Sequence, residues 1–122
     1  MRKPQQPATI LAIALIKMDA MAAFDFSVTE IAANGHDTLF LALDKMLTGI
    51  KKRFKDGNAS ALNEAKMIVE LGQKLQDSFG TEAYYISFSI KMGDFAEKLI
   101  KHDPTNENAI ELRDFVNVIR KR

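Results

Sequence analysis

The chain has 122 residues, 47% of them hydrophobic, and its 17 basic and 16 acidic residues leave a formal charge of +1. This length fits one domain with its own core, residues 1–122, and the near-neutral charge gives no long-range field to attract a polyanion. Cysteine is absent, which excludes disulfides, thiolate zinc sites and cysteine nucleophiles, and we expect a cytoplasmic protein.

The first expected element is a single helix over residues 8–24, which is apolar on nearly every face. A surface helix has one apolar stripe, so this helix is expected to be surrounded, either by its own domain or by a second copy of the chain. Leu11, Leu15 and Met18 share one face of it. These three residues are therefore candidates for a symmetric contact between chains.

The same apolar run also bears on targeting. It is too short to span a membrane. Lys17 and Asp19 follow it directly, at a place where a secretory signal would carry no charge. We expect neither a membrane partner nor a signal peptide.

A second helix is expected to begin at Ser27. Ser27 and Glu30 have the spacing of a capping box, in which two side chains satisfy the first backbone groups of a helix. Phe26 and Ile31 have the spacing of the hydrophobic staple that accompanies such a cap. The apolar period then continues to about residue 55, which predicts one long helix. Asn34-Gly35 is a turn signal that predicts a break instead, and both alternatives are open.

Residues 27–55 also resemble, loosely, the helix-turn-helix of DNA-binding proteins. Residues 28–32 would form the first helix, residues 34–36 the turn, and Asp37 would open the recognition helix. The resemblance implies a DNA-binding regulator. The turn is one residue shorter than the family's, and the face that would meet the bases carries Asp37 and Asp44, which repel phosphates.

A dense run of basic residues lies at the end of this region. Its members are Lys51, Lys52, Arg53 and Lys55. Cations in the last turn of a helix are stabilised by the exposed carbonyl groups, which explains the run without any ligand. The alternative is a nucleic-acid patch. Such a patch would need further basic residues from other parts of the chain, which the fold would have to bring close to the run. Those residues are Lys91, Lys98, Lys101, Arg120, Lys121 and Arg122.

A third helix is expected over residues 60–79, with one apolar stripe and a charged outer face that includes Glu64. Ala65 and Gly72 lie on the stripe and are small enough for a neighbouring element to approach closely. The predicted inner positions are Ala61, Ala65, Ile68, Gly72, Leu75 and Phe79.

Two more helices are predicted in the C-terminal part. Gly80 ends the third helix and Thr81 caps the fourth. Asp103 and Pro104 form a favoured cap and first-turn pair for the last helix. The predicted inner positions are Tyr85, Phe88, Met92, Phe95 and Leu99 in the fourth helix, and Ala109, Leu112, Val116 and Ile119 in the last.

Residues 84–119 resemble part of a tetratricopeptide repeat. The Gly-Asp-Phe stretch at 93–95 is similar to the turn inside such a repeat, and the Asp-Pro-Thr-Asn-Glu-Asn-Ala stretch at 103–109 to the start of the next one. The two signals lie closer together than in the family, and no second copy lies upstream. The resemblance implies a peptide-binding or scaffolding role.

Few single residues stand out as candidates for a site. Tyr84 and Tyr85 are adjacent, so on a helix they point about 100° apart and cannot both enter the core. They are therefore candidate contact residues. His36 and His102 lack carboxylates at metal-ligand spacing, so no metal site is expected.

These patterns predict an all-α protein, a compact bundle of five to six antiparallel helices with short loops. No cluster has the composition of a catalytic or cofactor site, so we expect a non-enzymatic protein without cofactors. The expected function is a protein–protein interaction module, such as an adaptor, chaperone-like binder or inhibitor, that acts through a helical surface and forms a homodimer or other homo-oligomer. The alternative is the DNA-binding regulator.

Overall fold

The computed structural model describes residues 7–80 and 84–121, which form six helices and no strand. The helices are α1 (Pro7–Ile16), α2 (Ala20–Asn34), α3 (His36–Lys55), α4 (Ala61–Phe79), α5 (Ser87–His102) and α6 (Glu107–Arg120). The predicted all-α bundle is therefore confirmed. No helix in this part of the chain is both long enough and apolar enough to cross a membrane.

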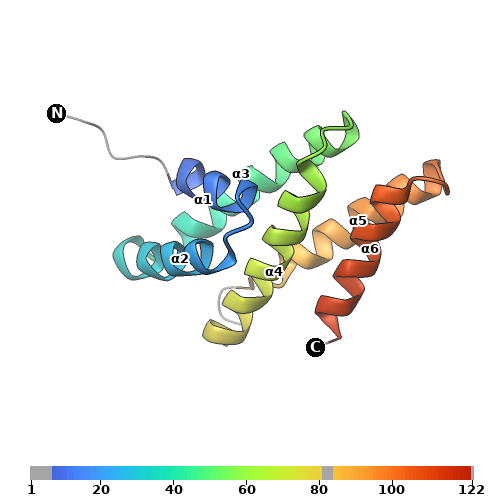
Figure 1. Ribbon diagram of the computed structural model, residues 1–122. Coiled ribbons are helices and arrows are strands. Elements are labelled where there is room, and N and C mark those ends of the chain that lie inside the picture. Colours follow the sequence, from blue (N-terminus) through green and yellow to red (C-terminus); the bar gives the residue numbers. More distant parts are fainter. Residues whose placement is uncertain (1–6, 81–83, 122) are drawn as a thin grey trace.

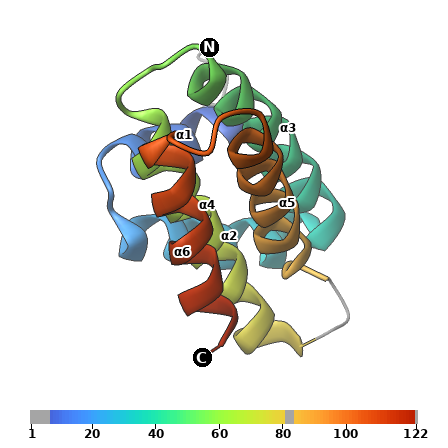
Figure 2. The same cartoon turned by 90° about the vertical axis from the view of Figure 1, so that its right-hand side faces the viewer.

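Helix α4 is the centre of the bundle and contacts all five other helices. In Figure 1, α1, α2 and α3 lie on one side of α4, and α5 and α6 lie on the other. Helices α3 to α6 alternate in direction, whereas α1 and α2 lie across them. Figure 2 shows α5 and α6 side by side, with α3 behind α5. The buried side chains form one continuous hydrophobic core.

The central place of α4 explains how many of its residues are buried. The predicted inner positions from Ala61 to Leu75 are buried, but so are Met67, Val69 and Leu71, because neighbours cover more than one face. Gly72 allows the close approach that its size predicted: a Cβ atom there would lie only 2.9 Å from the carbonyl oxygen of Tyr85.

The first predicted helix is wrong, because the chain breaks after Ile16. Met18 adopts the left-handed region with a φ of 54°, which ends α1. Asp19 then caps α2, and its carboxylate accepts a hydrogen bond of 3.0 Å from the backbone N–H of Ala22. Aspartate is among the best N-cap residues, so Asp19 was the available signal for this break.

The predicted cap at Ser27 is also wrong. Ser27 lies inside α2 and is fully buried, and its hydroxyl donates a 2.7 Å hydrogen bond to the carbonyl of Ala23 one turn earlier. Serine can bond to the preceding turn in this way as well as cap a helix. Phe26 and Ile31 are partly buried at the edge of the core. They form no hydrophobic staple, because the helix does not begin at Ser27.

Of the two alternatives for residues 27–55, the break is correct. Gly35, with a φ of 85°, separates α2 from α3, a conformation that glycine adopts without strain. His36 is the first residue of α3, and Asp37 lies in its first turn instead of at its cap. The side chains of α3 that face the core are Leu39, Leu43, Leu47, Ile50 and Phe54.

The starts of the last two helices differ from prediction, although their buried faces agree. Thr81 lies outside the described residues, and α5 begins only at Ser87. Asp103 follows the end of α5, and its carboxylate accepts hydrogen bonds from Thr105. The cap of α6 is Asn106, not Asp103. The buried side chains include Phe88, Met92, Phe95, Ala109, Leu112, Val116 and Ile119.

Candidate functional site

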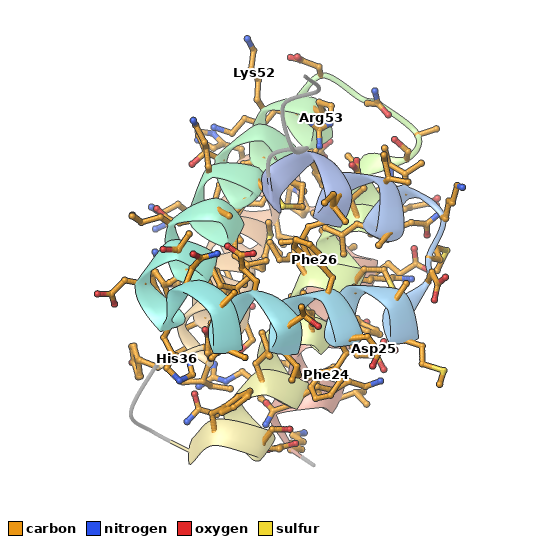
Figure 3. All side chains as sticks on the ribbon, turned by 90° about the vertical axis from the view of Figure 1, so that its left-hand side faces the viewer. Phe24, Asp25, Phe26, His36, Lys52 and Arg53 are labelled. Atoms are coloured by element: carbon orange, nitrogen blue, oxygen red, sulfur yellow. The ribbon has the colours of Figure 1, made fainter. Side chains whose placement is uncertain are left out.

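The basic run at the end of α3 is divided among different surroundings. Successive residues of a helix point about 100° apart, so neighbours in sequence face different sides. Lys51 and Lys55 face α5, and Arg53 faces the start of α4. In Figure 3, Lys52 extends outward from the end of α3, away from the bundle. The predicted four-residue patch is therefore not a single surface.

Lys51 and Lys55 instead join side chains of α5 around a cleft of about 290 Å³. We call it the lysine cleft, and it is lined by Lys51, Lys55, Lys91, Asp94, Phe95 and Lys98. Two of the basic residues proposed as support for the run, Lys91 and Lys98, thus reach it through the fold. Helices α3 and α5 pack loosely against one another, which leaves this space open at the surface.

The floor of the lysine cleft is the ring of Phe95, which is mostly buried. The Nζ atoms of Lys51 and Lys55 each lie 5.8 Å from the ring centroid, within range of a cation–π interaction. Lys91 forms a 2.8 Å ion pair with Asp44. For the other three cleft lysines, no carboxylate of residues 7–80 or 84–121 lies at ion-pair distance.

Lys51 lies in surroundings that disfavour its positive charge. Partial burial, followed by the charges of Lys91 and Lys98, lowers the pKa of Lys51 below its ordinary value. A lowered lysine pKa means that the surroundings disfavour the charged form. An anion placed among these ammonium groups would relieve that repulsion.

A second cavity, a groove of about 360 Å³, lies between α1, α3 and α4. Its walls include Ile13, Met46 and the ion pair of Arg53 with Glu64, whose Nη2 and Oε1 atoms are 3.0 Å apart. The Glu64 side chain is only 4% exposed, whereas that of Arg53 is 43% exposed. The prediction that Glu64 faces solvent is therefore wrong, and Arg53 compensates its charge.

Apolar side chains are exposed where α1 ends and α2 begins. Leu11 and Leu15 are fully buried within the chain and belong to its core. The prediction that these two residues contact a partner chain is therefore wrong. Ile13 and Ile16, on the opposite side of α1, are exposed. We call the exposed residues the N-terminal apolar surface: Ile13, Ile16, Met18 and Met21, which are 43%, 58%, 51% and 75% exposed.

Tyr84 and Tyr85 precede α5 and do not lie on it. Tyr85 belongs to the core, so its prediction as a contact residue is wrong, whereas Tyr84 stays a candidate. Tyr85 is fully buried, and its hydroxyl lies 3.0 Å from Nδ1 of His36. The edge of His36 meets the ring of Phe79, so this histidine has a packing role. Tyr84 is exposed and has a φ of 52°. Like Met18, it is an exposed apolar residue whose backbone has a conformation that residues other than glycine rarely adopt.

No group of three or more potential metal-ligating side chains is clustered in the part of the chain that the structure describes. Comparison with protein families, with curated proteins and with solved structures finds no match for this chain. Its function has to be inferred from the lysine cleft and the N-terminal apolar surface.

Proposed function

We propose that this protein is a small non-enzymatic interaction module, an adaptor, chaperone-like binder or inhibitor, that binds protein partners through its helical surface and self-associates. One observation carries the proposal. Helix α1 is apolar almost all round, and of its side chains that the structure describes, Leu11, Ala14 and Leu15 are buried whereas Ile13 and Ile16 are exposed. A helix of this kind is stable in water when a second surface covers its other side.

The positions of Met18 and Tyr84 support the same class of function. Each is a large apolar residue on the surface, and each has a left-handed backbone conformation. Such strain is often found at functional sites. The likeness of residues 84–119 to tetratricopeptide-repeat proteins also favours a role in peptide binding, although residues 93–95 lie within α5 here and not in a turn.

Sedimentation velocity over a concentration series tests self-association. We expect dimers at tens of micromolar, and we expect the double variant Ile16→Gln, Met21→Gln to weaken dimerisation because it makes the N-terminal apolar surface polar. Val118→Gln is the control, since Val118 is an exposed apolar residue on α6, at the other side of the bundle. A wild-type protein that stays monomeric at hundreds of micromolar, or equal losses in both variants, would contradict the proposal.

DNA binding through residues 27–55 is the second candidate, and the lysine cleft is the observation that favours it. A titration with mixed-sequence duplex DNA at two salt concentrations tests it, because binding to phosphates weakens steeply as salt rises. Submicromolar, salt-sensitive binding that is lost in Lys51→Gln would favour the regulator. Asp37 and Asp44 lie along the same helix, and their charges count against it.

A further inference from the structure

The lysine cleft has the properties of a preformed anion site. Lys51 and Lys55 approach it from α3, and Lys91 and Lys98 approach it from α5. The ring of Phe95 restrains two of these side chains before any ligand arrives. Restraint of this kind lowers the entropy that binding has to overcome.

The geometry favours a phosphoryl group over a carboxylate. A phosphoryl group carries close to two negative charges and three acceptor oxygens pointing in different directions. The lysines that line the cleft come from two helices, and each ammonium acts as a compact point charge that suits such a group. No arginine, whose planar fork matches carboxylates and phosphates alike, is among the described residues that line the cleft. The nearby Arg53 points to Glu64, on another side of α3.

Acidic residues limit how far an anionic ligand can extend. Asp94 lines the lysine cleft itself, and Asp44 holds Lys91 at its border. A nucleic acid carries closely spaced phosphates along its whole length, and several of them would meet these carboxylates. One isolated phosphoryl group would meet only Asp94, the carboxylate among the described residues that line the cleft.

We propose that the lysine cleft binds a phosphorylated side chain of a protein partner. The proposal rests on the proposed interaction function, because it names a chemical mark by which one partner is recognised. The protein would then have two binding surfaces, which are the lysine cleft between α3 and α5 and the N-terminal apolar surface.

Fluorescence anisotropy with the full-length chain tests this site. The probes are a degenerate peptide library with a fixed central phosphoserine and the same library with serine. We expect the phosphorylated library to bind about tenfold more tightly or better, as charge-assisted hydrogen bonds imply. We also expect the phosphorylated library to raise the melting temperature of the protein, because a ligand that binds the native state stabilises it.

Two double variants with the same change in net charge locate the binding. Lys51→Gln with Lys98→Gln removes one cleft lysine from each helix and should weaken phosphopeptide binding about tenfold or more. Lys52→Gln with Lys101→Gln alters exposed lysines of the same two helices and should change it less than about twofold. Equal losses in the two variants would overturn the proposal, since they would reflect net charge alone.

Other ligands give further decisive outcomes. Tighter binding of a mixed-sequence oligonucleotide than of the phosphopeptides would overturn the proposal in favour of a nucleic-acid site. Equally tight binding of inorganic phosphate would overturn the assignment to a protein partner. The two proposals can fail separately. A protein that stays monomeric but binds phosphopeptide supports the proposed site in the lysine cleft and contradicts self-association. A dimer that does not discriminate phosphoserine from serine contradicts only the lysine cleft.

Discussion

Substitution of Gly72 by alanine tests the contact between the centre of α4 and the start of α5. Inside a helix this change usually stabilises a protein by about 0.5–1 kcal/mol, because glycine loses more backbone entropy on folding. Here the new Cβ atom would lie 2.9 Å from the carbonyl oxygen of Tyr85 and 3.5 Å from Cβ of Phe88. The oxygen belongs to the backbone and cannot rotate away, so the two segments have to separate.

Forcing extra atoms into a packed core costs about 1–3 kcal/mol. After the gain in helix propensity, we expect Gly72→Ala to lower the free energy of unfolding by about 1 kcal/mol, within a range of about 0 to 2.5 kcal/mol. Urea denaturation followed by circular dichroism measures it. Gly49→Ala is the control, because its Cβ atom would meet only the end of the flexible Arg53 side chain, at 3.1 Å. If both variants were equally stabilised, the described contact between Gly72 and Tyr85 would be wrong.

Three further predictions concern the core. Ser27→Ala should cost less than about 1 kcal/mol in urea denaturation, because it removes only a bond to the preceding turn and not a helix cap. Phe88→Ala should cost about 3–5 kcal/mol and leave the protein largely unfolded at moderate temperature, because Phe88 is fully buried. Burial raises the pKa of Tyr85 to about 12. The folded state therefore holds the phenol proton more tightly than the unfolded state, so this contribution to stability is complete below about pH 10 and is lost as the pH rises towards 12. Absorbance of the phenolate and unfolding midpoints across this range measure the effect.

Helical periodicity predicted the buried faces of α5 and α6, and one of the covered faces of α4, because each of these helices packs an apolar stripe against its neighbours. It gave the wrong result for the first helix. Composition alone made residues 8–24 look continuous, and the break at Met18 contains neither glycine nor proline. Asp19 carried the signal, but an aspartate beside an apolar run is equally common on a helix surface. Ser27 shows the same ambiguity, since one hydroxyl can serve as a cap or bond to the preceding turn.

Only part of the lysine cleft could be predicted from the sequence. Lys51 and Lys55 lie four residues apart, and Lys91 and Lys98 lie seven apart, so each pair shares one side of its helix. What sequence could not give was that α3 and α5 lie beside one another, because that depends on how both pack on α4. The N-terminal apolar surface was predicted only in part. Met18 belongs to it, but a continuous helix placed Met18 on one face with Leu11 and Leu15, and the break at Met18 separates it from these two buried residues.

Arg53 has a role different from that of its basic neighbours, and a pair of variants separates them. Arg53→Met leaves the nearly buried carboxylate of Glu64 without its 3.0 Å partner, and an unsatisfied buried group of this kind costs about 1–3 kcal/mol. Lys52→Met alters an exposed side chain and should change stability by no more than about 0.5 kcal/mol. Adding Glu64→Gln to Arg53→Met should recover part of the loss, because an unpaired amide is less costly to bury than an unpaired carboxylate. Thermal unfolding of all three variants measures these differences. If Arg53→Met were no more harmful than Lys52→Met, helix-end charge alone would account for the run, and the ion pair would contribute nothing to the fold.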